Sequence, residues 1–119
     1  MTSENKKIRD NSCVEALFIL GELKQGRLIA ENMSATERQN IFDFLDLVYA
    51  NFISRIKADF DLTKGELLLA ALIKLGFSNQ QLMIVFDCEM KSVYKNKQRL
   101  KSHLLLSKDD ALEQMIAFY

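Results

Sequence analysis

The chain contains no proline in 119 residues and only four glycines. These two residues most often break helices and form tight turns, so a chain almost free of them is typical of helices joined by short polar links. Hydrophobic residues make up 49% of the sequence, which is enough to build a packed core in one domain of this length. The composition therefore predicts an all-α fold.

Three Ser/Thr-x-x-Glu sequences mark places where helices are expected to begin. In such a capping box the hydroxyl accepts a hydrogen bond from the third helical amide, and the Glu carboxylate accepts one from the capping residue. The three boxes start at Ser12, Ser34 and Thr63. The helix expected from Ser12 is so apolar that other elements should cover it on more than one side, and Gly26 should end or bend it.

The first sixty residues are expected to form a tail and two helices. Residues 1–11 are polar and charged, which predicts a flexible tail. After Ser34, apolar residues recur every three or four positions, which predicts one helix to about Ala58, the longest in the chain. Residues 12–60 then form an N-terminal helical pair. Packing within the chain is favoured over a pure dimer seam, although so apolar a helix could serve both.

Residues 61–119 carry the pattern of a helix-turn-helix. An apolar helix over 67–75 should end at Gly76, where glycine readily takes the left-handed conformation. A short helix is expected from Ser78, followed by a polar link and a basic amphipathic helix over 90–104. This order of elements predicts that the basic helix is held on a small helical domain.

The charges of the chain are unevenly distributed. It has 16 cationic and 16 acidic side chains in total. The segment from Glu89 to His103, however, contains five cations and one acid, which is a local excess of four positive charges. Val93, Leu100 and Leu104 share one side of this helix and should face the core. The pattern favours an element that reads DNA, because cations displace counterions from phosphates. A solvated, lysine-rich surface is the alternative on charge alone.

This half of the chain contains four short motifs. They are Leu62-Thr63-x-x-Glu66, the run from Leu72 to Ser78, the Ser92-Val93 start of the basic helix, and Arg99-Leu100-Lys101-x-x-Leu104. Together they resemble the LuxR/GerE-type helix-turn-helix of bacterial transcription regulators. The resemblance implies a four-helix domain in which the third helix reads DNA and the fourth often pairs with its mate in a dimer. Here the fourth helix would run from about Asp109 to Phe118.

The resemblance also implies roles for individual residues. The expected DNA-binding residues are Lys91, Ser92, Tyr94, Lys95, Lys97, Gln98, Arg99 and Lys101. Base contacts are expected from Tyr94, Lys95 and Gln98, whereas the lysines at 91, 97 and 101 would contact phosphates. The expected dimer interface consists of Leu112, Met115, Ile116 and Tyr119.

The basic helix departs from the family pattern at three positions. Glu89 stands where a Ser or Thr cap is usual and would repel a nearby phosphate. Asn96 stands where His is common, and His103 where Lys is common. Glu66 is expected to complete its capping box, or alternatively to pair with Arg99 and orient the basic helix.

Other chemistry is not expected from this sequence. Cys13 and Cys88 have no ligand or disulfide spacing and are expected to be reduced, buried thiols. The lone His103 should be an exposed or half-buried polar residue near a helix end. The sequence offers no metal-ligand spacing, phosphate-binding loop or nucleophile–base pair, so we expect no enzyme, cofactor or metal site. Without a long apolar run or a signal peptide, the protein is expected in the cytoplasm and not in a membrane.

Two functions remain open. The first is a bacterial DNA-binding transcription regulator, expected to be a homodimer that reads double-stranded DNA with residues 90–104. The second is a protein-interaction module on the same scaffold, whose partner is a sigma factor, RNA polymerase or another regulator. The neutral charge and Glu89 favour the second function. Met1 and the polar residues after it slightly favour a complete small regulator over the end of a larger one.

Overall fold

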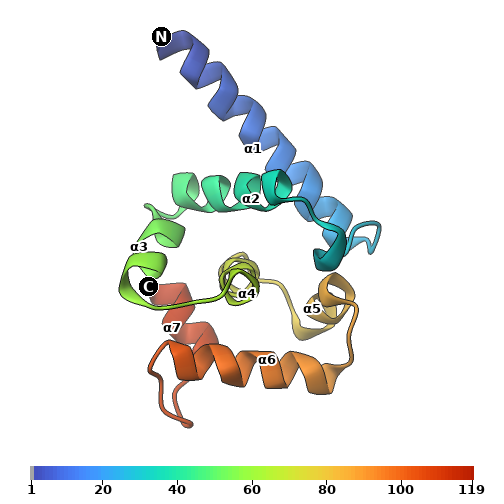
Figure 1. Cartoon of the computed structure of the whole chain (residues 1–119), viewed down its shortest axis with the longest axis vertical. Coiled ribbons are helices and arrows are strands. Elements are labelled where there is room, and N and C mark those ends of the chain that lie inside the picture. Colours follow the sequence, from blue (N-terminus) through green and yellow to red (C-terminus); the bar gives the residue numbers. More distant parts are fainter. Residues whose placement is uncertain (1) are drawn as a thin grey trace.

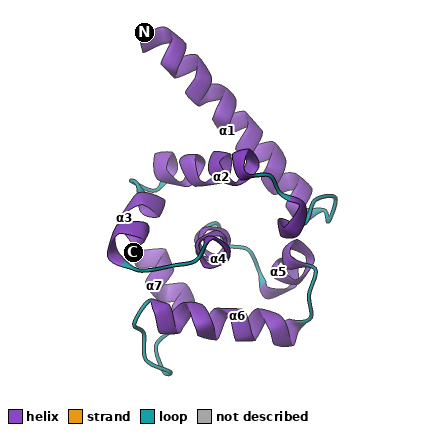
Figure 2. Ribbon diagram, viewed as in Figure 1, coloured by secondary structure: helices purple, strands orange, loops and turns teal. Residues whose placement is uncertain are grey.

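Helices account for nearly all of the regular structure. The structure, a computed structural model, describes the backbone of residues 2–119 and the side chains of residues 13–119 (Figures 1 and 2). In chain order, the described elements are α1 (Thr2–Lys24), the 3₁₀-helix η1 (Ala30–Asn32), α2 (Ala35–Val48), α3 (Phe52–Asp59), α4 (Lys64–Lys74), α5 (Asn79–Phe86), α6 (Met90–His103) and α7 (Leu112–Phe118). Residues 2–119 contain no strand, so the predicted all-α fold is confirmed.

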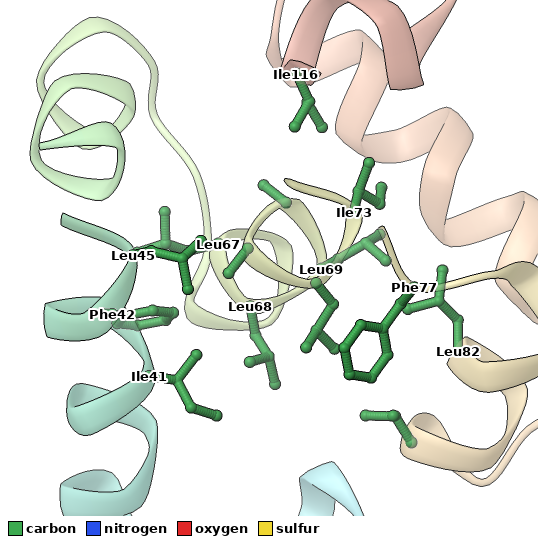
Figure 3. Packing of buried hydrophobic residues seen from close by; sticks show 14 of the residues in the cluster. Ile41, Phe42, Leu45, Leu67, Leu68, Leu69, Ile73, Phe77, Leu82 and Ile116 are labelled. Carbon is green, nitrogen blue, oxygen red and sulfur yellow. The ribbon is translucent and has the colours of Figure 1, made fainter. Parts of the chain in front are cut away.

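Helix α4 is the centre of the molecule (Figure 1). Every residue from Glu66 to Ile73 is buried, which leaves most of this helix without a solvent face. A helix that is apolar all round must be covered on all sides, and α2, α3, α6 and α7 all contact it. Figure 3 shows its side chains pointing toward buried residues of the surrounding elements, among them Ile41, Phe42, Leu45, Phe77, Leu82 and Ile116.

Side-chain caps define where three of these helices begin. The Ser34 amide donates to Glu37 Oε1 at 2.8 Å, and the Glu37 amide donates to Ser34 Oγ at 3.0 Å. The same reciprocal pair joins Thr63 and Glu66 at 2.9 and 3.1 Å. Two of the three predicted capping boxes, at Ser34 and Thr63, are therefore confirmed. Ser78 and Gln81 form a further one at the start of α5, at 2.8 and 3.1 Å.

The end of α4 is also as predicted. Gly76 has a φ of 86°, and its amide donates to the Ile73 carbonyl at 2.9 Å. The Phe77 amide donates to the Leu72 carbonyl at 3.0 Å, and the Phe77 ring is buried. This is a Schellman ending, which turns the chain sharply toward α5.

Helix α1 differs from its prediction. It begins at Thr2, so the predicted start at Ser12 is wrong. No proline or glycine lies in residues 2–11 to stop a helix from extending through them. Met1 lies outside the described residues, and the flexibility predicted for residues 1–11 stays a prediction. The predicted end is confirmed, because the helix stops at Lys24 and Gly26 has a φ of 74°.

The single long helix predicted from Ser34 to about Ala58 is divided into α2 and α3, so that prediction is wrong. Ala50 and Asn51 have φ values of 52° and 62°, and this left-handed conformation interrupts a right-handed helix. The longest helix is α1, with 23 residues.

Side chains from α2 and α3 stabilise this break by hydrogen bonds to its backbone. The Asp46 carboxylate accepts the Ile53 amide at 2.6 Å and the Ser54 amide at 3.1 Å, two of the amides that the start of α3 would otherwise leave unpaired. Arg55 Nε donates to the Ala50 carbonyl at 2.9 Å. The apolar spacing continues across the break, which explains why periodicity alone predicted one helix.

Replacing Gly76 with Ala should lower the free energy of unfolding by about 1 kcal/mol, because alanine is strained at this positive φ. A Cβ there would meet nothing within 4 Å, so only the backbone conformation is tested. Gly65→Ala is the matched control: it also has open space, but lies in α4 and should not destabilise. Urea unfolding of both variants measures the difference, and equal effects would contradict this role for Gly76.

Candidate nucleic-acid interface

Helix α6 is anchored to the core by one side only. Val93 and Leu100 are buried, as is Leu104, which caps the end of the helix. These are the three residues predicted to face the core, so their placement is confirmed. Their burial fixes which side of the basic helix remains in contact with solvent.

The opposite side of α6 carries most of the predicted DNA-binding residues. Six of the eight are exposed: Lys91, Ser92, Tyr94, Lys95, Gln98 and Arg99. We call this set the α6 outer face. The Tyr94 ring is a large aromatic group left 54% exposed. The side chains of Lys91, Lys95 and Arg99 form no hydrogen bond or ion pair with the described part of the chain. The α6 outer face therefore carries three cations that are available to an external anion.

Lys97 lies elsewhere. Its side chain is only 13% exposed, and its ammonium donates to Asn79 Oδ1 of α5 and to Glu113 Oε2 of α7, the latter at 2.6 Å. Two of the three ammonium donors and the charge of Lys97 are thus used inside the molecule, which does not favour the predicted phosphate contact; that contact stays a prediction. Lys97 ties α6 to the helices on either side of it.

Lys101 is also held within the chain. Its ammonium donates to the Lys108 carbonyl at 2.8 Å, in the loop between α6 and α7, and the residue is half-buried. A cation in the last turn of a helix also interacts favourably with the helix dipole. This bond uses one of the three ammonium donors, so the predicted phosphate contact would have to come from the other two.

Glu89 stands before α6 without capping it. Its backbone has the extended conformation of an N-cap residue, but its carboxylate accepts no hydrogen bond from the first turn, and the residue is exposed. The acid therefore lies at the entrance of the α6 outer face. Its charge opposes the approach of a phosphate there.

Glu66 and His103 form a pair that the sequence did not predict. His103 Nδ1 lies 2.6 Å from Glu66 Oε2, with the Glu66 side chain 8% exposed and the His103 side chain 44% exposed. The alternative pairing of Glu66 with Arg99 is not formed. A histidine at the end of α6 thus contacts the buried acid that also caps α4, and both ends of this contact are fixed by their helices.

The residues predicted to form a dimer interface pack inside the chain. Helix α7 begins at Leu112 and is shorter than predicted, and no side chain caps its first turn. Leu112 and Ile116 are buried in the core, while Met115 and Tyr119 are half-buried. The burial of Leu112 and Ile116 in the core of the single chain does not favour the predicted dimer surface, which stays a prediction.

Contacts with α3 and α4 hold the end of α7. The Lys74 ammonium donates to the carbonyls of Ile116 at 3.1 Å and Ala117 at 2.9 Å, and burial lowers its pKa. The Tyr119 hydroxyl donates to the Asp59 carboxylate, while Arg55 donates to the Tyr119 carbonyl at 2.6 Å. Burial and the Asp59 carboxylate raise the pKa of Tyr119 to about 12. These bonds fix α7 on the domain.

The described part of the chain offers few groups for other kinds of site. Cys13 and Cys88 are free and half-buried, less buried than predicted, and burial raises the pKa of the Cys88 thiol. Among the described residues, no three His, Cys, Asp or Glu side chains are grouped to hold a metal ion. None of the described helices combines the length and apolar character needed to cross a bilayer.

Comparisons of this chain with family models, with curated proteins and with solved structures found no match. The resemblance to LuxR/GerE-type regulators therefore stays a prediction based on the four motifs of residues 61–119.

Replacing Glu113 with Gln should reduce the loss of stability in acid. Burial raises the pKa of Glu113, but the hydrogen bond and charge of Lys97 outweigh it, so the net pKa lies below the ordinary value of 4.5. A depressed carboxyl pKa stabilises the fold above pH 4.5, and this stabilisation is lost as the pH falls through the folded-state pKa. The effect should be at most about 1 kcal/mol, since Glu113 is largely exposed.

The measurement is urea unfolding at about pH 7 and about pH 3 for both proteins. The parent chain should lose more stability than Glu113→Gln between the two values. An identical pH dependence would contradict a stabilising Lys97–Glu113 pair.

Proposed function

We propose that this chain is a DNA-binding transcription regulator of the LuxR/GerE type that reads the major groove with α6. The observation that carries the proposal is the α6 outer face, where Lys91, Lys95 and Arg99 have no partner among the described side chains while Val93 and Leu100 anchor the opposite side. A recognition helix needs this division between an anchored side and a side free to contact bases and phosphates.

The shape of the molecule supports the proposal. Helix α6 has 14 residues and is about 21 Å long, and an α-helix can enter a major groove about 12 Å wide. Figure 1 shows α6 along one edge of the molecule, with no other helix on its outer side. The loop between α6 and α7 extends past the end of α6 on this side, so the groove would receive the first turns of the helix, where Lys91, Ser92, Tyr94 and Lys95 lie.

The exposed side chains suggest a division of roles. Lys95 and Gln98 can donate to base edges, and the Tyr94 ring can contact a thymine methyl group or a sugar. Lys91 and Arg99 can contact phosphates, which position the helix without reading sequence. The Ser92 hydroxyl, in the first turn of α6, can also donate to a phosphate.

A protein-interaction module on the same scaffold is the second candidate. Lys97 and Lys101 are engaged within the chain, which leaves fewer cations for phosphates than the sequence predicted. Glu89 at the entrance of the α6 outer face and the formal net charge of zero also favour this candidate. Its partner would be a sigma factor, RNA polymerase or another regulator.

A titration of labelled random duplex DNA at two salt concentrations distinguishes the two candidates. A regulator that neutralises phosphates should bind the random duplex at low salt, and its affinity should fall as salt rises. The absence of binding at low salt would exclude the DNA-binding proposal and leave the interaction module.

Replacing Lys95 with Ala should weaken binding to the preferred sequence by about 1 to 3 kcal/mol and relax the base preference, if Lys95 contacts a base edge. Lys57→Ala is the matched control, since it removes the same charge from an exposed position on α3. Selection from a random duplex pool, followed by anisotropy titration, measures both effects. An unchanged base preference, or an equal loss in both variants, would count against this role.

Replacing Glu89 with Thr should raise both DNA affinity and stability. The substitution removes an acid from the entrance of the α6 outer face, and threonine can accept a hydrogen bond from the first turn of α6 that Glu89 does not accept. The gain in unfolding free energy should be about 1 kcal/mol. Unfolding and duplex titrations measure the two effects separately. A gain in stability with no gain in affinity would place Glu89 outside the DNA contact.

A further inference from the structure

A groove lies between the link that joins α3 to α4 and the end of α6. Its volume is about 550 Å³, and it is lined by residues 59–63 on one side and by Ser102, His103 and Leu105 on the other. We call it the α3–α4 groove. None of its lining residues belongs to the first turns of α6, so the groove is separate from the proposed DNA contact.

The link that forms one wall of the groove is extended. Phe60 and Thr63 have φ values of −137° and −71°, with ψ values of 151° and 165°, and Figure 2 shows a loop between α3 and α4. Phe60 and Leu62 are half-buried against the core, whereas Asp61 and Thr63 are exposed. This alternation is typical of a strand with one covered face.

The backbone of this link has free hydrogen-bonding groups. Within the described part of the chain, the amides of Asp61 and Leu62 donate no hydrogen bond, and the carbonyls of the same two residues accept none. An extended segment with unpaired donors and acceptors forms an edge with which a second extended chain can pair. Several peptide-binding domains bind their ligands by adding such a chain to an exposed edge.

Leu105, on the opposite wall, is held in a strained conformation at the surface. It follows the end of α6 with a φ of 60°, at a position where glycine is the usual residue because it takes this left-handed conformation without strain. Leu105 is 85% exposed, so packing within the chain offsets little of this strain. Its apolar side chain is instead available to a molecule that enters the groove.

The charge of the groove is negative. Asp59 and Asp61 line it, and no lysine or arginine does. The Tyr119 hydroxyl donates to Oδ2 of Asp59, whereas the side chain of Asp61 forms no hydrogen bond or ion pair with the described part of the chain. His103 contacts the buried Glu66 through Nδ1 at 2.6 Å. A ligand with a positive charge therefore complements this groove.

We propose that the α3–α4 groove binds an extended peptide of another protein in which basic and apolar side chains alternate. The peptide backbone pairs with the free amides and carbonyls of Asp61 and Leu62. Because successive side chains of an extended chain point in opposite directions, a basic side chain can reach the two aspartates while its apolar neighbour packs on Leu105. The proposal does not rest on DNA binding.

Selection of peptides from a random heptapeptide library on the immobilised full chain tests the proposal. The enriched peptides should alternate basic and apolar residues. Their consensus peptide is then synthesised and titrated into the labelled chain by NMR. The largest shift changes should fall in residues 59–63 and 102–105, which form the two walls of the groove.

Leu105→Gly tests the apolar wall. It should raise the Kd of the consensus peptide at least about tenfold, because the buried contact of the leucine side chain is lost. The variant should keep its fold, since glycine adopts the positive φ without strain. Leu47→Ala is the matched control: Leu47 is 53% exposed on α2, outside the groove, and its replacement should leave the Kd unchanged.

Asp61→Asn tests the charge of the groove. It should raise the Kd of the same peptide about threefold and weaken the dependence of binding on salt, because an exposed ion pair is lost. Asp43→Asn removes the same charge from an exposed position on α2 and should change neither quantity.

Three results would overturn the proposal: a selection that enriches no basic and apolar peptide, a consensus peptide that binds Leu105→Gly and Asp61→Asn as tightly as the parent, or shift changes concentrated outside the groove. A failure of the chain to bind DNA would leave it intact, because none of these measurements uses DNA.

Discussion

The burial of α4 on all sides is the constraint on which the rest of this structure depends. With every residue from Glu66 to Ile73 buried, this helix is stable only if other helices surround it, because each exposed apolar side would lose the free energy of burial. The single charged residue in this run, Glu66, can be buried because its carboxylate accepts the Thr63 amide and contacts His103. The same contact attaches the end of α6 to the start of α4.

The orientation of α6 follows from this arrangement. Val93 and Leu100 turn one side of the helix toward the core, and Lys97 then links it to α5 and α7 through Asn79 and Glu113. The five cations of α6 therefore have two different structural roles. Lys97 and Lys101 hold the helix and the following loop in place, whereas Lys91, Lys95 and Arg99 remain on the outer side. A charge count over the sequence cannot make this distinction, because it depends on residues far away in the chain.

The features that were predicted well depend on short stretches of sequence. The capping boxes at Ser34 and Thr63 and the left-handed Gly76 involve residues at most a few positions apart, so the sequence contains the whole interaction. The break between α2 and α3 is different. It requires two non-glycine residues with positive φ and the Asp46 carboxylate, which reaches seven residues along the chain to the Ile53 amide. Periodicity of the apolar residues continues across the break and hides it.

Helix α6 lies on the side of α4 away from α2 (Figure 1). DNA binding by the α6 outer face is the claim on which the proposed function depends. Its most direct test is an NMR titration of the labelled chain with duplex DNA, which reports on each backbone amide. If α6 enters the groove, the largest shift changes should fall between residues 89 and 99, with little change in α3. Changes concentrated outside α6, or none at low salt, would contradict it.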